Sequence, residues 1–168
     1  MPLGLCAVRT ILVVMKALTA IAAAFCALPF SAFAQSALED WRADPTRVFD
    51  ATEVDLDALI WEVRPLVVFA QSPNDPQFQR QMDLLSQDAS DLARRDIMVI
   101  TDTDPAARTD ARLALRPRAF MLALIGKDGQ TKLRKPAPWD VRELSRSIDK
   151  MPLRQQEIRD RRIVDPDL

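Results

Sequence analysis

One stretch of the sequence, residues 64–78 (RPLVVFAQSPNDPQF), constrains the fold more than any other. Its apolar run from Leu66 to Ala70 is short and does not alternate, which is typical of a strand buried on both faces of a sheet. Asp75 and Pro76 follow, and these residue types are preferred at the cap and the first position of a helix. The stretch therefore predicts a buried strand, a tight loop and the start of a helix.

Apolar residues continue beyond the loop at alternating steps of four and three, which places them on one face of a helix. They are Phe78, Met82, Leu85, Ala89 and Leu92. We therefore expect one long helix from Pro76 to about Ala93, with its apolar face packed against the sheet.

The rest of the chain predicts three more strands, the last two joined by the hairpin turn Gly126-Lys127-Asp128-Gly129. The expected strands are residues 97–100, 120–125 and 130–134. The expected helices are residues 36–43 with Ser36 as the cap, 55–60, 107–115 and 138–151. Strand, helix, strand, helix, hairpin and helix is the element order of a thioredoxin-like fold. We predict one α/β domain of about four strands with flanking helices.

The first 34 residues have the composition of a secretory leader. They contain no acidic residue, an apolar core at residues 17–30 and a small-x-small ending, Ala32-Phe33-Ala34. This pattern predicts a signal peptide cleaved before Gln35, with translation starting at Met1 or Met15. Pro29 interrupts the apolar run, which is shorter than the ~20 residues of a membrane span. We expect a periplasmic or secreted protein without stable membrane insertion.

The composition of the exported part excludes several kinds of chemistry. The chain has no histidine, and its two cysteines, Cys6 and Cys26, both lie in the leader. Disulfides, thiol redox chemistry, histidine acid–base catalysis and the usual zinc sites are therefore excluded after cleavage. Charges of both signs are interleaved, unlike the basic patch of a nucleic-acid-binding protein. We expect no cofactor and no catalytic residue.

Several segments resemble a family of short secreted bacterial proteins that carry a domain of unknown function. They are RPLVVFA (64–70), SPND (72–75), RRDIMVI (94–100), LIGKDGQTKLR (124–134) and IDKMPLR (148–154). That family is related to the thioredoxin-like domains of sushi-repeat matrix proteins, the DUDES group. The resemblance implies a thioredoxin-like fold and an envelope or extracellular setting, but no established activity.

The chain departs from active thioredoxins and peroxiredoxins in two places. Where those proteins carry a reactive cysteine after the first strand, this chain has Ser72-Pro73-Asn74-Asp75. Where thioredoxins place a cis-proline before the third strand, this chain has Phe120-Met121. By this comparison the thioredoxin-like domain spans residues 60–154, between a helical lead-in at 35–59 and a charged tail at 155–168.

The loop after the first strand is the place where the sequence favours a ligand. In thioredoxin-like folds this loop lies beside the turn before the third strand, which would bring Ser72 and Asn74 near Arg116 and Arg118. A helix N-terminus and two arginines together favour an anion, although Asp75 competes for the same helix N–H groups as their cap. Ser72 has no histidine or lysine nearby to activate it as a nucleophile.

Two other groups of residues have alternative interpretations. Asp102, Asp104 and Asp110 are hard oxygen ligands that would suit calcium or magnesium, but they also fit a solvated loop. The three tryptophans are expected in the core or in helix packing; they are Trp41, Trp61 and Trp139.

The sequence thus favours a non-catalytic, thioredoxin-like binding or adaptor protein of the cell envelope. Its expected partner is an envelope protein or a small anion. The alternatives are a redox-related enzyme of peroxiredoxin-like descent with thiol-independent chemistry, or a carboxylate metal-binder.

Overall fold

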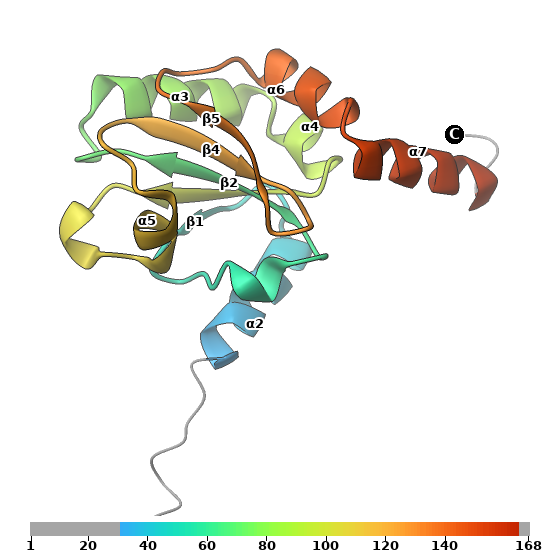
Figure 1. The fold of residues 1–168 in the computed structure, drawn as a ribbon, viewed down its shortest axis with the longest axis horizontal. Helices are drawn as coiled ribbons and strands as arrows, with labels where there is room; N and C mark the ends of the chain where they lie inside the picture. The colour runs from blue at the N-terminus through green and yellow to red at the C-terminus, as the bar shows by residue number, and fades with distance from the viewer. Residues whose placement is uncertain (1–30, 165–168) are drawn as a thin grey trace, which may run out of the picture. The chain divides into compact units, whose positions relative to one another are not determined.

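The computed structural model of the protein describes residues 31–164 (Figure 1). The predicted leader, residues 1–34, lies outside this range except for residues 31–34. The described residues form a five-stranded sheet with the strand order β1-β3-β2-β4-β5. The strands are β1 (Val48–Asp50), β2 (Arg64–Phe69), β3 (Ile97–Asp102), β4 (Met121–Ile125) and β5 (Thr131–Lys135).

Strands β1, β2 and β3 are parallel, whereas β4 runs antiparallel to both β2 and β5. Helices cover both faces of this sheet (Figure 1). One face packs against α2 (Ser31–Ala43), the 3-10 helix η1 (Asp57–Leu59) and α5 (Asp110–Leu115). The other packs against α3 (Pro76–Gln87), α4 (Ala89–Ala93) and α6 (Val141–Asp149). Two further helices are η2 (Pro105–Ala107) and α7 (Pro152–Val164). The predicted thioredoxin-like α/β fold is confirmed.

Strand β2 lies at the centre of the sheet, and all six of its residues are buried. Because β3 and β4 flank it and helices cover both faces, its side chains have no route to water. Apolar residues of the neighbouring strands and helices are buried as well, among them Leu85, Val99, Leu122, Leu124 and Leu144. The turn before β5 also has its expected form, with Gly129 at φ 73°.

Several predicted helix boundaries were wrong; for example, α5 begins at Asp110 and not at residue 107. The long helix from Pro76 breaks at Asp88, which has non-helical angles (φ −125°, ψ 32°) and separates α3 from α4. Asp and Ser have low helix propensity, and residues 87–90 hold one of each. Helix α2 begins at Ser31 and runs through Ser36, which is therefore no cap. Helix α6 was expected to start at Pro138 but begins at Val141, because the Asp140 carboxylate accepts from the N–H of Arg142 and caps the helix.

Other differences concern segments that the sequence pattern describes poorly. Strand β1 was not predicted, because its three residues become a strand only by pairing with β3. Of the helix expected at residues 55–60, only the three residues of η1 are helical. Within the described residues, no helix is long and apolar enough to cross a membrane.

The tryptophans do not all lie in the core. Trp41 is buried, and its indole Nε1 donates to the carbonyl oxygen of Ile97 over 3.2 Å. Trp139 is half-buried, but Trp61 is 66% exposed. Trp61 takes a positive φ of 70° where the chain leaves η1 and turns toward β2. Its expected burial was therefore wrong, because the backbone at this turn directs the residue away from the core.

Helix α7 is fastened to the sheet by a buried arginine at the start of β2. Arg64 is 1% exposed and donates to Glu157 Oε1 over 2.7 Å and to the Arg95 carbonyl oxygen over 2.9 Å. Arg154 donates to the other oxygen of Glu157 over 3.1 Å. The first half of the charged C-terminal segment is therefore part of the packed domain.

Candidate functional site

The loop at the carboxyl end of β2 is held by its own hydrogen bonds. Ser72 Oγ accepts from the backbone N–H of Asn74 over 3.2 Å. The Asp75 carboxylate accepts from the N–H groups of Gln77 and Phe78, over 2.8 and 3.4 Å. Asp75 is thus the helix cap that the sequence predicts. The N–H groups that would bind an anion already have a carboxylate.

The two arginines expected beside this loop are exposed. Arg116 takes a left-handed conformation (φ 49°) and ends α5, where its N–H donates to the carbonyl oxygen of Arg112. Neither Arg116 nor Arg118 forms an ion pair with a side chain in residues 37–163. Their approach to Ser72 and Asn74, and an anion between them, stay a prediction.

A buried ion pair at the carboxyl ends of β2 and β3 was not foreseen from the sequence. Arg112 Nε and Nη2 lie 3.0 and 2.6 Å from Asp102 Oδ1. Arg112 Nη2 also donates to the Ala70 carbonyl oxygen over 2.9 Å, and Thr109 Oγ1 donates to Asp102 Oδ2. The Arg112 guanidinium lies 5.5 Å from the centre of the Phe69 ring. This network joins α5 to both strand ends and satisfies the polar groups there.

The carboxylates considered for a metal site have separate tasks. Asp102 binds Arg112, whereas Asp104 caps η2 by accepting from the N–H of Ala106 over 2.9 Å. Asp110 begins α5 and faces a pocket described below. In the part of the chain that the structure describes, no group of three or more potential ligands could hold a metal ion.

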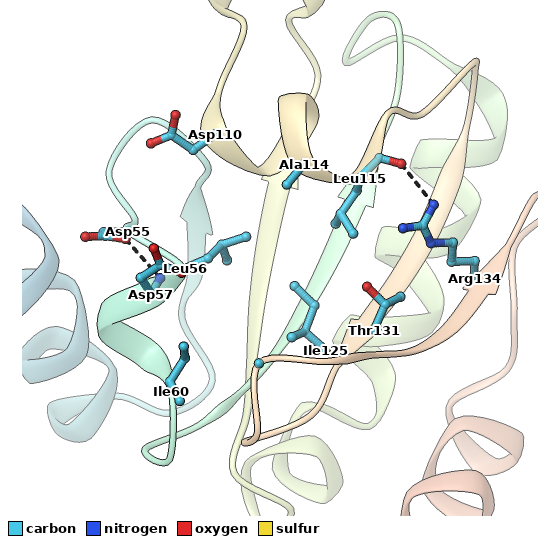
Figure 2. Close-up of a pocket in the computed structure, with 11 residues that line it drawn as sticks. Asp55, Leu56, Asp57, Ile60, Asp110, Ala114, Leu115, Ile125, Thr131 and Arg134 are labelled. Atoms are coloured by element: carbon cyan, nitrogen blue, oxygen red, sulfur yellow. Dashed lines mark hydrogen bonds between the residues drawn. The ribbon is translucent and has the colours of Figure 1, made fainter.

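A pocket of about 340 Å³ lies between η1, α5 and the β4–β5 hairpin (Figure 2). Its apolar lining comes from Leu56, Ile60, Ala114, Leu115 and Ile125. The pocket opens on the sheet face that is covered by α2, η1 and α5. It is separate from the loop that sequence reasoning selected.

The pocket follows from how the chain crosses this face. The connection from β1 to β2, residues 51–63, contains only the short η1, and α5 is also short. A longer crossover helix would cover the hollow between them. The pairing of β4 with β5 also shifts register beside the pocket: Leu124 pairs with Leu133, but Ile125 pairs with Thr131. This extra residue in β5 sets Thr131 at the pocket wall.

A family model matches the part of the fold from the approach to η1 to the first half of α7. The model described as Domain of unknown function (DUF4174) matches residues 55–157. The chain belongs to this family. The DUF4174 region begins at Asp55 in the pocket and ends at Glu157, the partner of the buried Arg64. It therefore contains all the residues that line the pocket. No curated protein matches the chain.

The polar groups of the DUF4174 pocket are divided by charge. Asp55, Asp57 and Asp110 lie on one side, and Arg134 lies on the opposite side (Figure 2). Arg134 Nη1 donates to the Leu115 carbonyl oxygen over 3.1 Å, at the end of α5. A ligand here would meet an apolar floor, a carboxylate-rich wall and a guanidinium that is already engaged.

These pocket residues give little signal in the sequence. Asp55 and Asp57 have the pattern of ordinary charges at a helix start, Asp110 was considered only as a possible metal ligand, and Arg134 has the pattern of an exposed strand residue. Only the topology brings the segment before β2, the start of α5 and the hairpin together. The site was therefore missed by reasoning from local motifs.

Proposed function

We propose that this DUF4174 protein is an exported, non-catalytic binding protein of the cell envelope, and that it binds its partner at the pocket between η1, α5 and the β4–β5 hairpin. The observation that carries the non-catalytic part of the proposal is that the charged groups at the strand ends already have partners. Asp75 caps α3, and Arg112 and Asp102 form a buried ion pair with each other. No nucleophile with an activating neighbour stands there, as covalent or acid–base catalysis requires.

The size and lining of the pocket support ligand binding. Its volume of about 340 Å³ falls within the range of about 300–1,000 Å³ that is usual for ligand sites. It combines an apolar floor with a few polar groups at its edges, which is the usual composition of such sites. The proposed partner is an envelope protein, since the leader pattern indicates export.

A photo-crosslinking experiment tests this proposal in cells that export the protein. We expect a benzophenone amino acid at Thr131, in the pocket wall, to give a discrete crosslinked product. The same residue at Gln87, exposed at the end of α3 on the other sheet face, should give none. Mass spectrometry of the product should also find an N-terminus at Gln35. Equal crosslinking at both positions, no product at Thr131, or a retained leader would contradict the proposal.

A further inference from the structure

We infer that the pocket receives a peptide segment of the partner protein that presents a lysine or arginine next to an apolar side chain. This inference rests on the proposed function and adds the chemistry of the partner. It follows from the charge of the pocket wall, the spacing of the carboxylates and the apolar surface around the opening.

The pocket carries more negative than positive charge. Asp55, Asp57 and Asp110 contribute three carboxylates, and Arg134 is the one cation of the lining. Within residues 37–163 none of these three carboxylates forms an ion pair, although Asp55 accepts from the N–H of Asp57 over 2.9 Å. Arg134 is directed to the Leu115 carbonyl oxygen instead. A cationic guest would supply the missing counter-charge.

The spacing of these carboxylates favours an organic cation over a metal ion. They come from two segments, the approach to η1 and the start of α5 (Figure 2). They do not form a group that could hold a metal ion. An ammonium or guanidinium group carries three or five N–H donors, which can reach acceptors that are spread along one wall.

The apolar parts of the site favour a peptide over a free amine. Leu56, Leu115 and Ile125 line the pocket and would pack against an aliphatic side chain. Beside them, Ile60 is 36% exposed and the next residue, Trp61, is 66% exposed. Tryptophan is among the residue types enriched in protein-binding hot spots. Trp61 follows Ile60 in the chain but does not line the pocket, so a partner that contacts both would be larger than the pocket.

The backbone at Trp61 holds this apolar residue at the surface. Its N–H donates to the Lys127 carbonyl oxygen over 2.7 Å, which ties the η1 segment to the hairpin turn. The left-handed conformation of Trp61 is strained for a non-glycine residue, so the surrounding structure must hold it in place. Two walls of the pocket are thereby fixed relative to each other before any partner binds, which lowers the ordering cost of binding.

Titration with matched peptides tests the inference. The probes are acetyl-Leu-Lys-amide, acetyl-Leu-Glu-amide, acetyl-Leu-norleucine-amide and spermidine, added to the ¹⁵N-labelled exported protein. We expect saturable NMR shifts at Leu56, Ile125 and Thr131 with the lysine peptide at millimolar concentration. The norleucine peptide and spermidine should each bind more weakly, and the glutamate peptide weakest of all.

A matched pair of charge variants makes the test specific. Asp57→Asn with Asp110→Asn should weaken binding of the lysine peptide by about tenfold, as expected for two partly exposed ion pairs. Asp83→Asn with Asp88→Asn removes the same charge from exposed positions on the other sheet face and should change affinity less than about twofold. Similar loss in both variants would show a general charge effect and overturn the inference.

The other outcomes are equally decisive. Tighter binding of the glutamate peptide would show that the pocket prefers an anionic guest and would overturn the inference. Equal binding of the norleucine peptide would remove the cationic requirement, and tighter binding of spermidine would indicate a free polyamine. No saturable shift with any probe would also overturn the inference. If crosslinking at Thr131 succeeds while these titrations fail, the partner chemistry is wrong and the proposed function stands.

Discussion

Asp102→Ala is expected to lower the free energy of unfolding by about 3–5 kcal/mol, the usual cost of breaking a buried ion pair by removing one partner. The side chain of Asp102 is 1% exposed and that of Arg112 is 10% exposed. The substitution leaves the guanidinium buried between Ala70 and Phe69 without its carboxylate. Urea denaturation of the purified exported protein at pH 7 measures the change.

Two further variants show whether the buried charge is the cause. Asp128→Ala removes a carboxylate paired with Lys132, both side chains 30% exposed, and should cost less than about 1 kcal/mol. Asp102→Leu combined with Arg112→Met removes both charges and should be more stable than Asp102→Ala alone. A cost below about 1 kcal/mol for Asp102→Ala would show that this buried ion pair does not stabilise the attachment of α5 to the strand ends.

Glu157→Gln is expected to lower the free energy of unfolding at pH 7 by about 2–4 kcal/mol, because Arg64 loses its ionised partner. Arg64 is 1% exposed, whereas the Glu157 side chain is 19% exposed, and Asp96 remains 3.7 Å from the guanidinium. These features place the effect below that of a fully buried pair. Amide hydrogen exchange should show faster opening of α7 in the variant. Unchanged exchange in α7 would contradict its attachment through this residue.

The same carboxylate gives the protein an acid sensitivity. Burial alone would raise the pKa of Glu157, but hydrogen bonds from Arg64 and Arg154 outweigh it and lower the pKa below its ordinary value of 4.5. Such a group contributes stability above pH 4.5, and this contribution is lost as the pH falls through the lowered pKa of the folded state. Glu157→Gln should therefore show a shallower loss of stability below pH 4.5 than the parent protein. Glu143→Gln, which removes an exposed pair with Arg146, should follow the parent curve.

The sequence predicts the parts of the fold that rest on local signals. The buried run of β2, the Asp75 cap and the Gly129 turn each depend on a few neighbouring residues, and all three are confirmed. Strand β1 has only three residues, and its Phe49 is buried because β3 provides a partner. Trp61 shows the reverse, since a hydrophobic residue was expected inside and the turn places it outside.

The candidate site could not be predicted because its residues are distant in the sequence. Asp57, Asp110 and Arg134 come from three elements that meet only in the folded sheet. Arg112 is similar: one charged residue in a short helix gives no sign that its guanidinium bridges Asp102 and the Ala70 carbonyl. The strand-end loop and its Asp75 cap were recognisable from the sequence, but the Ser72 hydrogen bond and the Arg112–Asp102 pair were not.

The binding surface itself is tested most directly by comparing two variants against the partner captured through Thr131. One variant carries Asp57→Asn and Asp110→Asn in the pocket, and the other carries Ser72→Ala and Asn74→Ala in the strand-end loop. Isothermal titration of the purified partner should show about tenfold weaker binding to the pocket variant and a change below about twofold for the loop variant. Loss of affinity in the loop variant with parental affinity in the pocket variant would contradict the account.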